Sequence, residues 1–238
     1  MTFAERVSIP GAVVAQAEPE VRAAFIRRTY AHLAGAVGAF VAIEYLLVTS
    51  PAAPRLLAVM VGGRFRWLLV LGLFMAVGYL ADRWARSRVS KSMQYLGLGL
   101  YVLAEAVLFL PLIYVAAFYS TPNVLPTAAV LTIGLFAGLT GTVFITKKDF
   151  SFLGGALTVG FFVALGLIVA SLIFGFDLGL VFSGAMILLA AGTILYDTSN
   201  VLHHYEPDQH VAAALALFAA IALLFWYILR LLMELQRD

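Results

Sequence analysis

The chain has 238 residues, of which 63% are hydrophobic and 12% charged, and its mean hydropathy is +1.00. Soluble domains are typically about 45–50% apolar and about 25% charged, so this composition excludes a water-soluble protein and predicts an integral membrane protein embedded in the lipid bilayer. The net charge of +2, with no basic cluster interleaved with aromatics, argues against a nucleic-acid partner. The absence of cysteine excludes disulfides and thiolate metal sites.

Residues 1–28 are polar and carry both acidic and basic side chains, without the compact apolar core of a cleaved signal. We expect this segment to become helical after Pro19. We interpret residues 1–28 as a polar cytoplasmic tail and residues 29–238 as the transmembrane domain.

Seven apolar runs follow the polar segment, and a helix needs about 20 mostly apolar residues to cross a bilayer. The apolar stretch 56–63 could lengthen the second run, but Arg64 and Arg66 interrupt it. The pattern predicts an all-α integral membrane protein with about seven transmembrane helices, at 29–49, 67–81, 93–118, 124–146, 151–174, 178–201 and 211–233.

Lys and Arg are distributed unequally between the two sides of this arrangement. Membrane proteins carry an excess of Lys and Arg on the cytoplasmic side, which favours a cytoplasmic N-terminus here and, with seven helices, a C-terminus on the opposite side. The ten Lys and Arg then assigned to the cytoplasmic side are Arg6, Arg22, Arg27, Arg28, Arg83, Arg86, Arg88, Lys91, Lys147 and Lys148, against five elsewhere: Arg55, Arg64, Arg66, Arg230 and Arg237.

Small residues recur at the spacing of helix-packing faces. Gly134 and Gly138 form a small-xxx-small pair, and Gly97 and Gly99 lie near the start of the 93–118 run. Glycines at such positions let two helices approach closely, so we expect close helix contacts there; a hinge for gating is the alternative.

Three carboxylates lie inside apolar runs: Asp197, Glu105 and Glu44. A carboxylate at membrane depth is costly and usually faces the bundle interior or a water path, which makes Asp197 and Glu105 candidates for an ion path and a pH gate. Burial favours the neutral acid and a nearby arginine favours the carboxylate, so either group can change its charge near neutral pH. The alternative is a structural hydrogen-bonding role. Glu44, a secondary candidate, is also explained by hydration near the outer interface.

Basic groups lie at a depth that matches Asp197. Arg83 and Arg86 follow the second apolar run, and either could act as a latch that holds the Asp197 carboxylate; ordinary positive-inside anchoring explains them equally. His203 and His204 extend the Asp197 segment and titrate in the physiological range, which makes them secondary candidates. The two histidines are not part of a recognised metal-binding motif such as HExxH, so we predict no tightly bound metal.

Catalysis has little support in the sequence. Ser183 lacks the first glycine of a GxSG element and has no obvious histidine partner, and no glycine-rich phosphate loop occurs. The chain is therefore predicted not to be an enzyme and to carry no cofactor.

Four strings together resemble the Bax inhibitor-1 family, also called the transmembrane Bax-inhibitor-motif family. They are AEAVLFLP at 104–111, GLTGTVF at 138–144, TKKDFSFLGG at 146–155 and ILYDT at 194–198, and the match in helix order covers nearly all of 29–235. The resemblance implies a seven-helix bundle whose last helix is central and wrapped by the other six. It also implies a bacterial inner-membrane protein.

The resemblance further implies one of two functions. Bacterial members are implicated in a pH-sensitive calcium leak, in which the aspartate of ILYD pairs with a second aspartate on the last helix and an arginine latches the pair. Asp197 matches the first position and Arg83 or Arg86 the latch, but Ala220 stands where the second aspartate is expected. Other members modulate a membrane-bound quality-control protease.

We therefore carry two hypotheses from the sequence. The first is a pH-sensitive cation leak, with Ca²⁺ or H⁺ as candidate permeant ions, gated at Asp197 with only transient Ca²⁺ binding there, since one carboxylate supplies too few ligands for a tight site. The second is a non-conducting membrane protein that binds and modulates a membrane protease or stress-response partner.

Overall fold

The computed structural model describes residues 13–87 and 90–236, and within these ranges the chain is helical without strands. Seven of the described helices are long and apolar enough to cross a membrane, which confirms the predicted all-α, seven-span architecture. After the short 3-10 helix Val14–Gln16, the α-helices are α1 Pro19–Thr49, α2 Ala53–Val61, α3 Arg64–Ala85, α4 Lys91–Tyr119, α5 Val124–Thr146, α6 Leu153–Phe174, α7 Gly179–His203 and α8 His210–Leu235.

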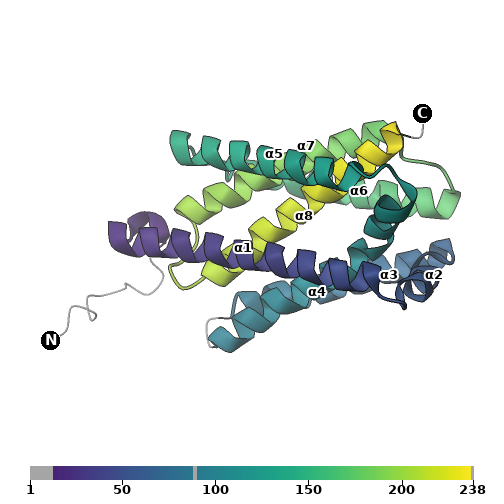
Figure 1. Cartoon of the computed structure of the whole chain (residues 1–238). Coiled ribbons are helices and arrows are strands. Elements are labelled where there is room, and N and C mark those ends of the chain that lie inside the picture. Colours follow the sequence, from purple (N-terminus) through teal and green to yellow (C-terminus); the bar gives the residue numbers. More distant parts are fainter. Residues whose placement is uncertain (1–12, 88–89, 237–238) are drawn as a thin grey trace.

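The long helices run back and forth along one bundle axis (Figure 1). We call one end the Asp149 end; it holds the start of α1 and the α3–α4, α5–α6 and α7–α8 loops. The other is the Asp177 end, which holds the short α2 and the end of α8. The odd number of long helices therefore brings the described chain in at the Asp149 end and out at the Asp177 end.

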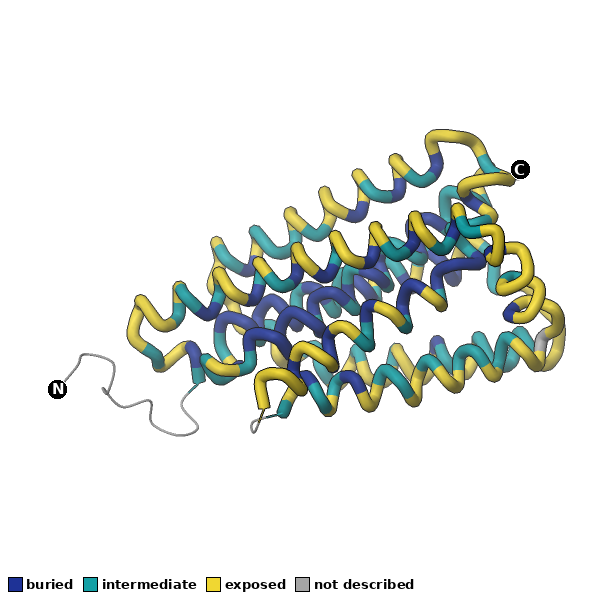
Figure 2. Tube along the Cα trace, turned by 60° about the horizontal axis from the view of Figure 1, so that its bottom comes forward, coloured by how far each residue is buried: buried dark blue, intermediate teal, exposed yellow. Residues whose placement is uncertain are grey.

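Helix α8 occupies the centre of the bundle, as the family resemblance implied for the last helix. It contacts α1, α3, α4, α5 and α7, and most of its residues are buried. Figure 2 shows the buried residues gathered in the interior of the bundle. Phe218 of α8 packs edge-on against Phe40 of α1 at 5.9 Å between ring centroids. A helix that is apolar on all sides is stable only when protein or lipid covers every face, and α8 is covered mainly by the other helices.

The segment before residue 29 is partly packed onto the bundle. Helix α1 begins at Pro19, in agreement with the expectation of helix after this residue, and Val14 is fully buried. The Val14 N–H donates to the Tyr205 carbonyl at 2.8 Å. Residues 1–12 of the predicted tail lie outside the described part of the chain, whereas residues 13–28 are anchored at the Asp149 end.

The glycine predictions divide into two outcomes. A Cβ added at Gly97 would come within 2.5 Å of the Ala81 carbonyl oxygen and 2.6 Å of the Ala85 nitrogen, so this glycine does permit a close α3–α4 approach. The prediction was wrong for Gly134, Gly138 and Gly99, where a Cβ would meet nothing within 4 Å. Small residues at helix spacing also occur on outward faces, where no neighbouring helix uses them.

Candidate functional site

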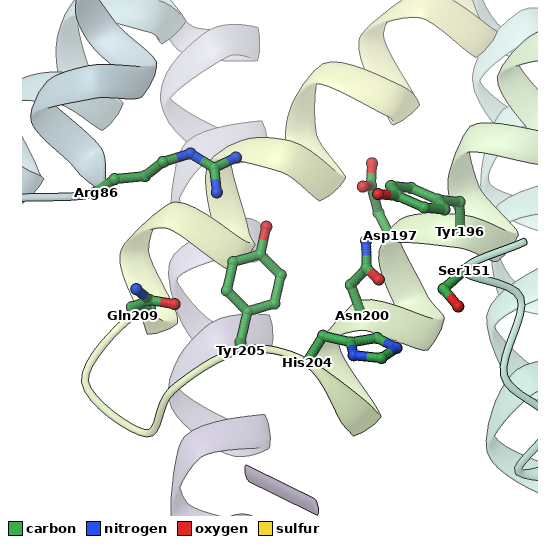
Figure 3. A pocket seen from close by; sticks show the side chains of 8 residues that line it. All are labelled: Arg86, Ser151, Tyr196, Asp197, Asn200, His204, Tyr205 and Gln209. Atoms are coloured by element: carbon green, nitrogen blue, oxygen red, sulfur yellow. The ribbon is translucent and has the colours of Figure 1, made fainter. Parts of the chain in front are cut away.

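A polar cavity of about 390 Å³ opens at the Asp149 end of the bundle (Figure 3). We call it the vestibule. The end of α3, the α5–α6 loop, the last turns of α7 and the α7–α8 loop build it, so two helix ends and two loops converge on one space. Its lining residues are Arg86, Ser151, Tyr196, Asp197, Asn200, His204, Tyr205 and Gln209.

A second cavity, of about 840 Å³, lies deeper in the bundle among α3, α4, α6, α7 and α8. We call it the inner cavity. Most of its wall is aliphatic and aromatic, and it reaches toward the Asp177 end. The charged or phenolic side chains in its wall are Asp82, Tyr101, Glu105, Asp177, Asp197, Tyr227 and Arg230.

Asp197 is the residue that the linings of the vestibule and the inner cavity share. It belongs to the buried stripe of α7 that also includes Ala190, Ile194 and Val201, spaced so that all four lie on one helix face. Its side chain is therefore turned into the bundle, and the residue is only 8% exposed. A single ionisable group thus lies at the boundary between a polar opening and an apolar interior.

Arg86, at the end of α3, is the basic group of the vestibule. Its Nε donates to both carboxylate oxygens of Asp82 at 2.9 Å, an ion pair one helical turn long. Asp82 lines the inner cavity, so this pair also joins the two cavities, on the α3 side. Burial lowers the pKa of the Arg86 guanidinium, but the hydrogen bond and charge of Asp82 outweigh burial and raise it, so Arg86 is a permanent cation.

Tyr205 of the α7–α8 loop lies beside Arg86. Its hydroxyl and the Arg86 guanidinium point into the same part of the vestibule, with the Asp197 carboxylate across from them (Figure 3). Burial, followed by the negative charge of Asp197, raises the pKa of Tyr205 well above its usual range. The hydroxyl therefore stays protonated and is available as a hydrogen-bond donor in the vestibule.

The α5–α6 loop is fastened to the end of α7 beside the vestibule. Lys147 ends α5 in the left-handed conformation, at φ 52°, and this turn presents Asp149 to α7. Asp149 accepts hydrogen bonds from the Ser151 N–H at 2.8 Å and the Ser199 hydroxyl at 3.1 Å, and pairs with His204 Nε2 at 3.0 Å. These bonds, the Ser151 N–H first, hold the pKa of the Asp149 carboxyl well below its usual range.

The structure separates the sequence-predicted residues into different places. Asp197, Arg86 and His204 line the vestibule, and Glu105 lines the inner cavity at 5% exposure. Arg83 is exposed and lines neither cavity.

The two remaining candidates also lie apart from the cavities. His203 Nδ1 bonds within its own helix, to the Ser199 carbonyl at 2.9 Å. Glu44 is 4% exposed, so hydration at the outer interface does not account for it. Neither of its carboxyl oxygens has a hydrogen-bond partner among the residues that the structure describes.

Sequence reasoning missed Asp82, Tyr101 and Tyr205. Asp82 did carry a signal, because a carboxylate four residues before an arginine on a helix is positioned to pair with it. No local signal marks Tyr205, whose place depends on the α7–α8 loop folding back against the end of α3. Ala220 is 2% exposed and lines the inner cavity, so the position where the family pattern has an aspartate is apolar here.

The described residues form no preformed metal site: among them, no three His, Asp or Glu side chains lie close enough together to hold an ion. The carboxylates in the cavity walls are hard oxygen ligands, of the kind that suits Ca²⁺ better than a transition metal.

Known proteins are similar to this chain over nearly its full length. The model of the family described as "Inhibitor of apoptosis-promoting Bax1" matches residues 22–237. Bax inhibitor 1 of Schizosaccharomyces pombe is 30% identical over 230 residues, which cover 94% of this chain and 82% of that protein. The Golgi anti-apoptotic protein of Vaccinia virus (strain Lister) is 29% identical over 231 residues, covering 93% and 90%.

A bacterial relative matches a shorter part. The modulator of FtsH protease YccA of Escherichia coli (strain K12) is 36% identical over 94 residues, 39% of this chain and 42% of that protein. The residues that the family model matches include the strings around Asp149 and Asp197. The chain is therefore a multi-pass membrane protein that belongs to the Bax inhibitor-1 family.

Proposed function

We propose that this protein is a pH-sensitive cation leak of a bacterial inner membrane, with Asp197 as the gate. The observation that supports this most is that Asp197 lines both the vestibule and the inner cavity. An ion moving between the two cavities passes this side chain, so its charge and position control the passage. Ca²⁺ is the candidate ion, because carboxylates and water are the ligands it prefers.

Arg86 is the latch in this proposal. Its guanidinium faces the vestibule opposite Asp197 (Figure 3), whereas Arg83 lines neither cavity. With Asp197 ionised, attraction to Arg86 holds the side chain across the boundary and the path is closed. Protonation removes the charge and this attraction, so the path opens as pH falls. The proton shifts the equilibrium between the closed and the open state because it binds Asp197 more tightly in the open state, where Arg86 no longer holds the carboxylate.

The pH response depends on every ionisable group that faces Asp197. Tyr205 adds no negative charge beside Asp197, because its hydroxyl stays protonated. The surrounding α8 positions in the inner cavity are apolar, among them Ala219 and Ala220. The other ionisable side chains that line the two cavities near Asp197 are Asp82 and Arg86 of α3, Tyr101 and Glu105 of α4, and Tyr196 and His204 of the α7 end.

Glu105 and Asp82 supply carboxylates to the inner cavity, whereas Ala220 stands where the family resemblance leads us to expect an aspartate. Both line the inner cavity together with Asp197, so a cation that enters meets acidic groups from three different helices. Without a preformed cluster such groups bind Ca²⁺ weakly, which suits a leak, because conduction requires that the ion also leaves. We propose that the Asp149 end faces the cytoplasm, so the vestibule samples cytoplasmic pH.

The test is Ca²⁺ flux into proteoliposomes between about pH 6 and pH 8. Wild-type protein is expected to leak more at the lower pH, and Asp197→Asn is expected to remove this pH dependence because the amide cannot ionise. Asp208→Asn is the matched control: this carboxylate lies exposed in the α7–α8 loop and lines neither cavity. A folded Asp197→Asn protein with an unchanged pH response would refute the gate.

The second candidate function is modulation of a membrane protease, and the relative named as a modulator of FtsH protease favours it. Val14 is hydrogen-bonded to Tyr205, which lines the vestibule, and residues 19–28 belong to helix α1. A partner that binds residues 1–12 would therefore act close to the vestibule.

Removal of residues 2–12 is the sharp test of this tail, because a longer deletion would also remove the buried Val14. The shortened protein is expected to lose capture of a copurified membrane protease while its thermal unfolding is unchanged. Capture at wild-type strength would contradict the tail as the binding element.

A further inference from the structure

The inner cavity has a size and shape that a passing ion does not require. Its volume of about 840 Å³ lies in the range of pockets that hold drug-sized molecules, roughly 300–1,000 Å³. Along α8 its lining runs from Leu215 to Arg230, which is about 22 Å at about 1.5 Å per residue. The cavity is therefore long and narrow, suited to an extended molecule.

The wall of the cavity is apolar along most of this length. Trp67 and Phe74 of α3, Phe109 of α4 and Trp226 of α8 contribute aromatic surface, and α6 contributes aliphatic side chains. Phe109 and Trp226 pack edge-on at 4.8 Å between centroids, which forms a rigid aromatic wall. Such a wall favours an alkyl chain or a hydrophobic ring system.

Glu105 is the acidic group in the middle of this wall. Tyr101 contacts Phe218 and Phe109 contacts Trp226, so Glu105, which lies between Tyr101 and Phe109 on α4, is level with the middle of α8. The cation within the lining, Arg230, is roughly 12 Å farther along α8. It donates to Glu234 at 2.8 Å. Arg86, at the other end, is paired with Asp82.

The charges of the lining are thus unbalanced toward acid. Four carboxylates, Asp82, Glu105, Asp177 and Asp197, face one arginine in the inner cavity. A buried carboxylate is stabilised by a cation that also forms a hydrogen bond with it. Tyr101 hydrogen-bonds Glu105 but carries no charge. A phospholipid tail would therefore leave Glu105 without a cationic partner, and an anionic headgroup would be repelled.

We propose that the inner cavity binds a lipophilic amine, with its ammonium group on the Glu105 carboxylate and its apolar body along α8 against Phe109 and Trp226. The Tyr101 hydroxyl, which hydrogen-bonds Glu105, lines the same part of the cavity. This binding site does not rest on ion conduction, because an amine can occupy it whether or not ions pass Asp197.

Trp226 provides the readout. In protein that carries Trp67→Phe and Trp84→Phe, Trp226 is the remaining tryptophan, and bromine quenches its fluorescence at short range. The probe is a twelve-carbon alkylammonium brominated at mid-chain, and its neutral counterpart is the alcohol with the same brominated chain. Both are titrated into nanodiscs of zwitterionic phosphatidylcholine, and concentrations are compared as mole fractions in the bilayer.

The ammonium probe is expected to quench Trp226 saturably at a mole fraction about tenfold lower than the alcohol, as a charged hydrogen bond would produce. Glu105→Gln is expected to abolish this difference and leave the alcohol curve unchanged. Glu44→Gln is the matched control, since Glu44 is equally buried but lines neither cavity.

Ala219→Phe tests the same site without touching the carboxylate. Ala219 lines the cavity wall on α8, and a phenyl ring there fills the space for the apolar body, so the ammonium curve is expected to move toward higher mole fraction. Equal quenching by the ammonium and the alcohol in wild-type protein would overturn the proposal and leave bilayer lipid as the occupant. A charge preference that survives Glu105→Gln in folded protein would overturn it as well.

Discussion

Arg86 Nε donates to both carboxylate oxygens of Asp82 at 2.9 Å, and the same guanidinium faces Asp197 across the vestibule. One arginine is therefore divided between two carboxylates, one on its own helix and one on α7. Where the family pattern has a second aspartate on the last helix, this chain has Ala220, and the second acid near Arg86 comes from α3 instead. The strength of the latch depends on this competition.

Loss of the arginine is expected to release the gate. Arg86→Gln removes the charge that holds the Asp197 carboxylate, so the Ca²⁺ leak at about pH 8 should rise several-fold toward the level that wild-type protein reaches at about pH 6. Arg83→Gln is the matched control, because Arg83 has the same charge on the same helical turn but lines neither cavity. If both variants leak alike in liposome flux assays, Arg86 is not the latch.

Neutralising Asp82 is expected to have the opposite effect. In Asp82→Asn, Arg86 loses its competing partner and interacts more strongly with Asp197, which favours the closed, ionised state. The midpoint of the flux–pH curve should move to lower pH by roughly 0.2–0.7 pH unit, the size of a half-exposed ion pair. A midpoint that moves to higher pH would show that Asp82 supports the latch rather than competing with it.

The Asp149 contacts predict a pH dependence of stability outside the membrane. The pKa of Asp149 is lowered in the folded protein, so its contribution is fully present above its ordinary value of 3.8 and is lost as pH falls below that value. Asp149→Asn should therefore lower the melting temperature at about pH 7 by roughly 1–2 °C, a small change because the side chain is half-exposed.

At about pH 3 the difference in melting temperature between Asp149→Asn and the wild type should be smaller than at about pH 7, since part of the wild-type advantage has been titrated away. Thermal unfolding of detergent-solubilised protein measures this difference, with Asp208→Asn as control. An equal loss at both pH values would mean that the loop contacts do not depend on the Asp149 charge.

Gly97 is expected to be intolerant of a side chain. In Gly97→Ala the new Cβ would meet backbone atoms of α3 at 2.5 and 2.6 Å, so α3 and α4 must separate. Overpacking of this kind costs about 1–3 kcal/mol. The neighbouring Gly99→Ala, whose Cβ would meet nothing within 4 Å, is expected to be neutral or slightly stabilising.

Thermal unfolding compares the two glycine variants directly. Because α3 carries Asp82 and Arg86, Gly97→Ala should also shift the flux–pH curve, whereas Gly99→Ala should not. Equal melting temperatures for the two variants would contradict the close α3–α4 packing as a source of stability.

The sequence by itself determined the number and approximate bounds of the membrane helices. In lipid a spanning segment must satisfy its backbone hydrogen bonds internally, as a helix does, and must be long and apolar enough to cross the bilayer, so each such run indicates one helix. It also identified Asp197 and Glu105, since a carboxylate inside an apolar run is costly wherever the helix lies. Such arguments need only the local chain and its solvent.

Tertiary structure decided which of these groups meet. Arg86, and not Arg83, lines the vestibule together with Asp197. Glu44 is buried because neighbouring helices cover it, and Asp197 joins two cavities because α3, α7 and the α7–α8 loop converge there. These relations depend on how each helix is rotated about its axis and packed against its neighbours. Residues that are distant in the chain set this rotation and packing together, and an apolar run alone carries no information about either.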